Sequence, residues 1–242
     1  MVYLQLKKIL MKKAIFVFIL TGICCSNGFS QKIKNYTVQP GENILEIIPK
    51  ADMYEYPQFE KGFIYFRSGA KSTSRVNYNF IYEEIFFINM KGDTLTLNNP
   101  EEVKMLTIGD DIFYLAGKRF VKSDTAIGEI RLAVATFFAT VSKRKIGAYG
   151  TTTDAASDSY STYVMPNEVK LDLIPQVVTT IERQQALFIG NRFNQFQLVN
   201  RQNIFSLYAE KEVLLKKYLK ENKVNFSSRR QIINLIVYMN NQ

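Results

Sequence analysis

Residues 103–124 read VKMLTIGDDIFYLAGKRFVKSD, with short runs of Val, Ile, Phe, Tyr and Leu between glycines and aspartates. Runs of this composition, bounded by turn residues, are typical of β-strands. Gly109, Asp110 and Asp111 separate two of the runs. Turn chemistry accounts for them without a metal site, because neighbouring carboxylates on a strand point to opposite faces. The stretch therefore predicts antiparallel strands joined by tight turns.

The same pattern extends toward the N-terminus. Three segments are again rich in β-branched and aromatic residues: 59–69 (FEKGFIYFRSG), 70–80 (AKSTSRVNYNF) and 82–97 (YEEIFFINMKGDTLTL). Gly92 stands where a hairpin turn needs a positive φ. Strands and turns at such short intervals indicate a meander that forms a sandwich or an open barrel.

Residues 127–145 fit two patterns. Ile130, Leu132 and Val134 alternate with Ala133 and Ala135, as they would on a strand. The segment also fits an apolar helical stripe, which would run through Ile127, Ile130, Val134, Phe137 and Val141. Enrichment in Thr and Val favours one long strand.

The pattern changes near the C-terminus. We expect a strand at 168–174 (EVKLDLI) and a hairpin at 186–199, closed around Gly190 and Asn191. Residues 208–223 follow a helical period, with Glu212 and Lys216 at i,i+4 spacing. A last helix begins after Ser227 or Ser228, and its apolar face comprises Ile232, Ile233, Leu235, Ile236 and Met239.

The predicted fold class is α+β and mainly antiparallel β, a meander followed by a C-terminal helical hairpin. We expect a signal peptide at 1–30, in which 1–10 is an upstream extension, and a lead-in segment at 31–58. A β-rich domain at 59–200 would carry a mobile loop near 151–161, because small polar side chains bury too little area to offset the entropy of ordering. The helices at 201–242 would pack on this same domain.

The N-terminus predicts export. Lys12 and Lys13 precede the apolar run AIFVFILTGICC, and small residues lead to a cleavage site between Ser30 and Gln31. The run is shorter than the about 20 apolar residues of a membrane-spanning helix, so the chain is not expected to be transmembrane. The expected location is the periplasm, the outer membrane surface or the medium. The alternative is a lipoprotein acylated at Cys24 or Cys25.

The composition excludes several chemistries. The chain has no histidine, which excludes the Ser-His-Asp triad and histidine metal sites. Both cysteines would leave with the signal, and thiol nucleophiles with them. Cleavage also removes four lysines and lowers the net charge from +9 to +5. We therefore expect no cofactor, no metal, no nucleic-acid partner and no enzymatic activity, with carboxylate-based hydrolysis as the remaining, least favoured catalytic option.

Residues 143–164, KRKIGAYGTTTDAASDSYSTYV, give the candidate binding site. A phosphate-binding loop would need Gly-Lys-Ser or Gly-Lys-Thr, and Thr151 and Thr152 follow Gly150 without the lysine. The segment is better explained as a loop whose tyrosines and cations form an adaptable contact surface. The residues singled out are Lys143, Arg144, Lys145, Tyr149, Tyr160 and Tyr163.

Several strings in the chain resemble a group of exported proteins of Bacteroidota that has no assigned activity. They are KGFIYFRSG (61–69), the NYN…GDTL meander within 76–115, KRKIGAYG with its AYG turn (143–150), and the C-terminal helical pair that contains LKKYLKENKVNF (215–226). The likeness covers most of the chain after the signal. It implies export and this architecture, and it implies no functional residue.

The favoured function is that of a non-catalytic cell-envelope protein that binds an envelope protein or other envelope component. Cations crowd the terminal helices and favour an acidic partner or peripheral contact with anionic lipid; they are Lys211, Lys216, Lys217, Lys220, Lys223, Arg229 and Arg230. The alternative is a carrier of a small apolar ligand or lipid inside a curved sheet, lined by Phe63, Phe66, Phe86, Phe87 and Phe113.

Overall fold

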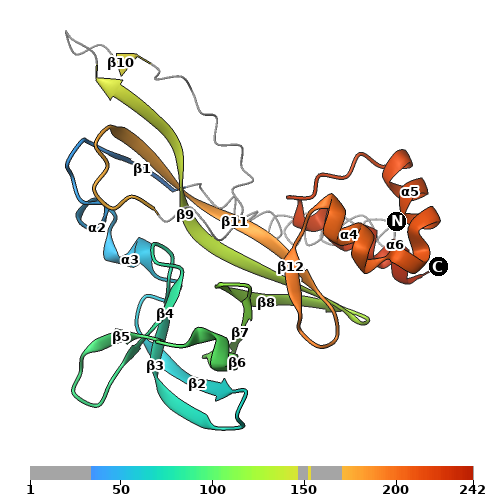
Figure 1. Cartoon of the computed structure of the whole chain (residues 1–242), viewed down its shortest axis with the longest axis horizontal. Coiled ribbons are helices and arrows are strands. Elements are labelled where there is room, and N and C mark those ends of the chain that lie inside the picture. The colour runs from blue at the N-terminus through green and yellow to red at the C-terminus, as the bar shows by residue number, and fades with distance from the viewer. Residues whose placement is uncertain (1–33, 147–151, 154–170, 242) are drawn as a thin grey trace, which may run out of the picture. The chain divides into compact units, whose positions relative to one another are not determined.

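The computed structural model describes residues 34–146, 152–153 and 171–241, and these belong to one unit, Lys34–Gln242. Their strands form one twelve-stranded antiparallel sheet (Figure 1). The strands are β1 (Asn35–Val38), β2 (Glu60–Phe66), β3 (Lys71–Asn79), β4 (Glu84–Ile88), β5 (Thr94–Thr96), β6 (Val103–Ile108), β7 (Asp111–Ala116), β8 (Arg119–Ile127), β9 (Ile130–Ile146), β10 (Thr152–Thr153), β11 (Val178–Gly190) and β12 (Phe196–Leu198).

The sheet consists of two meanders. Strands β2 to β5 follow one another in space, as do β6, β7, β8, β9 and β11, and β6 joins the two sets by pairing with β2. β1 lies on the other side of β11, while β12 pairs with the end of β11 and β10 with the end of β9. The α+β, mainly antiparallel prediction is confirmed, and the sheet is open. Gly92 and Gly109 have φ of +92° and +56°, as the turn chemistry requires.

One glycine is needed where three strands meet. Gly62 in β2 pairs with Ser74 of β3 and Ile108 of β6. A Cβ at this position would overlap the Val76 side chain and the Thr107 carbonyl oxygen. Only glycine lets the two meanders approach this closely where they join.

The larger apolar core lies within the two meanders. Its buried members come from β1 to β4, β6 to β9 and β11 and from the helices and turns beside them. The peptide N–H of Phe138 in β9 donates to the Phe80 carbonyl at 3.1 Å. The lead-in segment closes one side of this core through α2 (Ile44–Ile47) and α3 (Lys50–Met53). Sequence periodicity missed these two helices and β1, because each is only four residues long.

The long ladder of β9 with β11 has two buried faces. On one face, Leu132 of β9 and Ile189 of β11 belong to the core of the C-terminal helices. On the other, Ala133 and Phe188 belong to a third, smaller cluster. The predicted alternation of large and small apolar residues is confirmed, and the helical interpretation of 127–145 is wrong. Further along β9, Phe138 enters the larger core, so this one strand links both.

Four helical segments follow the last strand: α4 (Arg201–Leu207), η3 (Ala209–Lys211), α5 (Glu212–Glu221) and α6 (Arg229–Asn240). α4 was not predicted. The sequence pattern assigned α5 and α6 correctly, and Ser228 occupies the N-cap position of α6. The 3-10 segment η2 (Pro100–Glu102) lies between β5 and β6. The side chains of Ile232, Leu235, Ile236 and Met239 are fully buried, as the apolar stripe predicted.

Three sequence predictions are either wrong or fall outside the described residues. Residues 171–174 (LDLI) contain no strand, so the prediction of a strand at 168–174 is wrong for the described part. Leu173 instead accepts a hydrogen bond at its carbonyl from the N–H of Ile44. The signal peptide at 1–30 falls outside the described residues. So does the loop near 151–161, apart from Thr152 and Thr153, which pair with Ile146 and Lys145.

Candidate functional site

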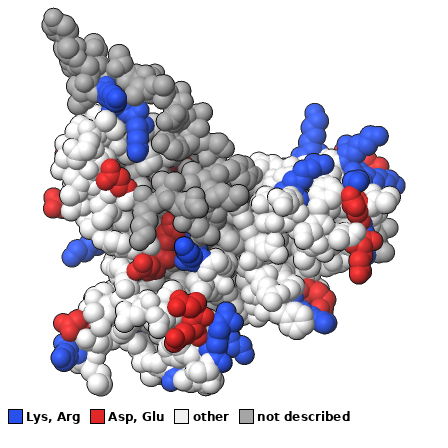
Figure 2. All heavy atoms as spheres, viewed as in Figure 1, with Lys and Arg blue, Asp and Glu red and all other residues white. Residues whose placement is uncertain are grey.

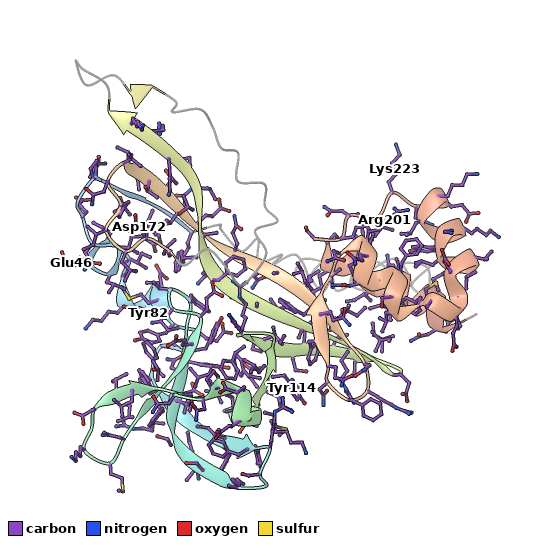
Figure 3. All side chains as sticks on the ribbon, viewed as in Figure 1. Glu46, Tyr82, Tyr114, Asp172, Arg201 and Lys223 are labelled. Carbon is purple, nitrogen blue, oxygen red and sulfur yellow. The ribbon has the colours of Figure 1, made fainter. Side chains whose placement is uncertain are left out.

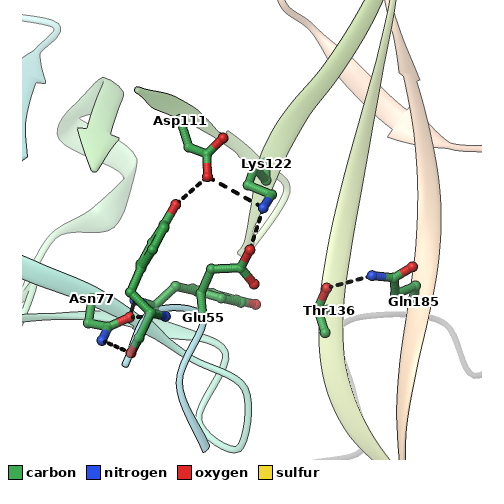
Figure 4. Close-up of polar contacts among 8 residues, drawn as sticks. Glu55, Asn77, Asp111, Lys122, Thr136 and Gln185 are labelled. Atoms are coloured by element: carbon green, nitrogen blue, oxygen red, sulfur yellow. Dashed lines mark hydrogen bonds and ion pairs between the residues drawn. The ribbon is translucent and has the colours of Figure 1, made fainter. Parts of the chain in front are cut away.

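A polar network joins three distant parts of the chain beside the larger core. The Lys122 ammonium of β8 contacts the Glu55 carboxylate and lies 3.4 Å from Asp111 Oδ2 of β7. The Tyr56 hydroxyl donates to the same Asp111 oxygen at 2.6 Å. Figure 4 shows Lys122 between the carboxylates of Glu55 and Asp111. The network fastens the segment after α3 to the second meander.

A buried amide fixes the backbone on which two of these groups stand. Asn77 of β3 is 1 % exposed; its amide donates to the Tyr56 and Gln58 carbonyls at 2.8 and 3.2 Å, and its oxygen accepts from the Tyr56 N–H at 3.2 Å. Every one of these partners is a backbone group. Asn77 therefore supplies hydrogen bonds to the backbone of a segment that is not in a β-strand. Glu55 and Tyr56 are thereby held in position.

In this network two carboxylates stabilise the charge of one ammonium. Burial lowers the pKa of Lys122, but the hydrogen bonds and charges of Glu55 and Asp111 outweigh it, so the pKa of Lys122 is raised. Burial, followed by the hydrogen bond to Asp111, raises the pKa of Tyr56. The lysine stays protonated and the phenol neutral at ordinary pH. The arrangement is that of a clamp between elements.

A second, more deeply buried ion pair lies between β8 and the β3–β4 turn. The guanidinium of Arg119, whose side chain is 5 % exposed, pairs with the Glu83 carboxylate and lies 4.1 Å from the centre of the Phe137 ring. Glu83 has φ of +59°, which a residue with a Cβ adopts at a cost of order 1 kcal/mol or more. The ion pair with Arg119 helps to hold Glu83 in this conformation.

Burial is the largest influence on the pKa of Glu83. Desolvation raises the pKa of Glu83, the charge and hydrogen bond of Arg119 oppose it, and the net direction is upward. Tyr78 is 2 % exposed and is influenced by the charges of both Glu83 and Arg119. Burial and then the Glu83 charge raise the pKa of its phenol.

No three His, Cys, Asp or Glu side chains in the described ranges are grouped so that they could hold a metal ion. Sequence reasoning missed both ion pairs, since no local motif joins their members.

The predicted loop site is only partly described. Lys143 and Lys145 are exposed on β9 and Arg144 is half-buried, so the three cations alternate between the two faces of the strand. They do not form one cationic patch. Tyr149, Tyr160 and Tyr163 lie outside the described residues, and the proposed contact surface stays a prediction.

The phenylalanines of the carrier alternative do not share one surface. Phe113 is buried in the larger core and Phe66 and Phe87 pack at its edge. Phe86 neighbours Phe87 on β4 and therefore points to the opposite face, where it contacts Tyr54 and Tyr82. Phe63 lies beneath the ammonium of Lys71, 4.1 Å from its ring centre.

Positive charge is concentrated in the C-terminal helices. Residues 201–242 contain eight Lys or Arg and three Asp or Glu, which gives +5. The described residues before Arg201 contain seventeen cations and sixteen acids, which gives only +1. In Figure 2, Lys and Arg side chains gather over this helical part of the visible face. The excess charge thus belongs to one region of the fold.

Some of these cations have internal partners. Arg229 forms two hydrogen bonds with Asp124 of β8, at 2.6 and 3.1 Å, and Lys211 donates to the Met239 carbonyl at the end of α6 at 2.9 Å. Lys216 pairs with Glu212 at 2.6 Å, as the i,i+4 spacing predicted. The Arg229 contact joins α6 to the sheet, the Lys211 contact joins the N-cap residue of α5 to the end of α6, and the Lys216 pair lies within α5.

The other helical cations are exposed. Lys217, Lys220, Lys223 and Arg230 extend from the surface, and Lys223 points away from the helices in Figure 3. We call Val213, Lys216, Lys217 and Lys220 the lysine face of α5, because at 3.6 residues per turn these positions share one side of the helix. The sequence predicted a crowd of cations here, and the structure shows which of them share a side.

Among the described helices, none is long and apolar enough to cross a membrane. Comparison with protein-family models, with curated proteins and with solved structures gave no match to this chain.

Proposed function

We propose that this chain is an exported, non-catalytic binding module that associates with the cell envelope through its C-terminal helices. The observation that carries the proposal is the segregation of charge: +5 on residues 201–242 against +1 on the described remainder. A surface of one sign attracts partners of the other and raises their local concentration. The partner is therefore an anionic component of the envelope.

The polar networks of the sheet support a non-catalytic role. Lys122 lies between two carboxylates, and Arg119 is paired with Glu83. Each of these charges has a partner of opposite sign on another element, which is the arrangement expected of groups that hold a fold together. Lys217 and Lys220 of α5 instead leave positive charge at the surface for a partner.

Export is supported by the charged, apolar and small-residue segments between Lys12 and Ser30 and by the resemblance to exported Bacteroidota proteins. Protein purified from its native host should begin at Gln31, as mass spectrometry of the N-terminal peptide would show. A start at Met1 or Met11 would contradict export. An acylated N-terminus at Cys24 or Cys25 would favour the lipoprotein alternative.

The binding role is tested by retention on washed envelopes of the native host. The double variant Lys217→Glu/Lys220→Glu reverses two charges of α5 and should lose most of its retention, because the attraction depends on those charges. The matched control is Lys91→Glu/Lys104→Glu, which reverses two exposed lysines, one in the turn between β4 and β5 and one in β6. The measurement is the fraction of purified protein that sediments with the envelopes, with circular dichroism to verify the fold.

If both double variants lose retention equally, net charge alone governs association with the envelope. If both are retained as well as the parent protein, the C-terminal helices do not contribute to binding. Either result contradicts the assignment of binding to the C-terminal helices.

A further inference from the structure

The lysine face of α5 combines three lysines with one exposed apolar side chain. Val213 is 85 % exposed, and Lys216, Lys217 and Lys220 lie on the same side of the helix. Glu212 and Glu221 are also exposed, at the two ends of the helix, and Glu212 pairs with Lys216. Lys217 and Lys220, followed by Lys223 beyond the helix, make the middle and the C-terminal end of the solvent side cationic.

The opposite side of α5 is committed to the protein core. Leu215 is fully buried, and Leu214, Tyr218 and Leu219 pack against the same cluster as α6 and the ends of β9 and β11. The Tyr218 ring lies 4.6 Å from that of Tyr238 on α6. α5 cannot turn its apolar side outward without breaking this core. Only the lysine face is presented to a partner.

The residue types favour a lipid surface over a protein partner. Protein interfaces are enriched in Arg and aromatic anchors and depleted of Lys, and α5 carries lysines while its tyrosine faces inward. Lysine is a flexible, strongly hydrated point charge that does not fix the geometry of a carboxylate partner. Such side chains suit a fluid layer of anionic headgroups, to which clustered basic residues bind without fixed geometry.

We propose that the lysine face of α5 docks on the surface of an anionic lipid bilayer. This inference rests on the proposed binding function and names its partner. Contact is electrostatic and peripheral: the lysines reach the headgroups, and Val213 is the apolar side chain of this face that meets the interface. Because the remaining apolar side chains of α5 stay in the core, the helix does not insert as a free amphipathic helix would.

This mode of docking sets the expected size of the effects. Each lysine near an anionic surface strengthens binding roughly fivefold, so neutralising two of them should weaken it roughly thirtyfold. Salt should weaken it further, since the Debye length shortens from about 14 Å at about 0.05 M to about 4 Å at about 0.5 M. A bilayer without net charge should bind no protein at either salt concentration.

The test is sedimentation of protein purified from the native host with protein-free vesicles. One set consists of phosphatidylcholine alone and the other contains about 30 % phosphatidylglycerol, each at about 0.05 M and about 0.5 M salt. The variants are Lys217→Gln/Lys220→Gln and, as the matched control, Lys91→Gln/Lys104→Gln. Glutamine keeps a long side chain with good helix propensity, so the helix is retained. Thermal melting checks that both variants are folded.

The proposal is supported if the parent and the control variant bind anionic vesicles at low salt and the α5 variant does not. Binding to neutral vesicles, or equal binding by the two variants, overturns it. If no protein sediments with vesicles while envelope retention still depends on Lys217 and Lys220, the bilayer proposal fails and the binding function stands. If neither vesicles nor envelopes are bound, both fail.

Discussion

Removing residues 227–242 is expected to leave a chain that does not fold. The deletion takes away α6, in which the side chains of Ile232, Leu235, Ile236 and Met239 are fully buried. Truncating one such side chain costs about 2–5 kcal/mol, so losing four costs about 8–20 kcal/mol, which is comparable to or greater than the about 5–15 kcal/mol that holds a typical domain together. The expected measurement is the loss of the cooperative thermal transition in circular dichroism.

Two point variants of α6 compare the loss of a buried side chain with the loss of an exposed one in the same helix. Leu235→Ala should lower the free energy of unfolding by about 2–5 kcal/mol in urea titration, because it opens a cavity in the core. Val237 lies on the same helix but is 41 % exposed, so Val237→Ala should change the free energy of unfolding by less than about 0.5 kcal/mol. A truncated protein that stayed soluble and melted at the parent temperature would show instead that α6 is an appendage.

Replacing Arg119 by methionine is expected to cost about 3–5 kcal/mol at pH 8, since it leaves the half-buried Glu83 carboxylate without its partner. Methionine keeps the apolar contact over Phe137, so the loss reports mainly on charge. The matched control is Lys118→Met, which removes the neighbouring exposed cation and should have little effect. Urea titration gives both free energies of unfolding.

The penalty of Arg119→Met should shrink as pH falls. The folded-state pKa of Glu83 already lies above the ordinary 4.5, so the fold favours the protonated carboxyl. The contribution of this group to stability is therefore highest below about pH 4.5 and declines as pH rises through the folded-state pKa. Without Arg119 that pKa rises further, and the decline continues to higher pH. A penalty that is equal at pH 8 and at low pH contradicts this account.

The double variant Arg119→Met/Glu83→Gln provides an internal check on this explanation. It removes the stranded charge, and it should recover part of the stability that Arg119→Met loses at pH 8. Below the pKa of Glu83 the two variants should have similar stability. No recovery at pH 8 would place the cost in packing around Phe137 instead.

The sequence predicted those elements whose pattern is local and strong. Alternation of Leu132 and Val134 with Ala133 and Ala135 predicted β9, because each face of that strand meets a different apolar cluster. The α6 stripe was correct for the same reason, as all four of its central side chains face one core. Glycine turns were correct where a positive φ is needed, as at Gly92.

Elements that depend on distant partners were not predicted. β11 was recognised only near its end, because its middle reads Glu182, Arg183, Gln184 and Gln185 and has no apolar alternation. These residues are in a strand because β9 pairs with all of them. The two ion pairs are of the same kind: Glu55 meets Lys122, and Glu83 meets Arg119, only after the meanders are assembled.

The pairing of β1 with β11 has a consequence for how the chain acquires its fold. Asn35–Val38 is the first described strand, and its partners are Thr179–Glu182, near the other end of the sequence. The ribosome releases β1 long before β11 has been synthesised, so for most of translation this segment has no strand to join. Contacts between such distant segments slow folding, because a long loop must close first. The sheet therefore cannot be completed at this edge until β11 has been synthesised.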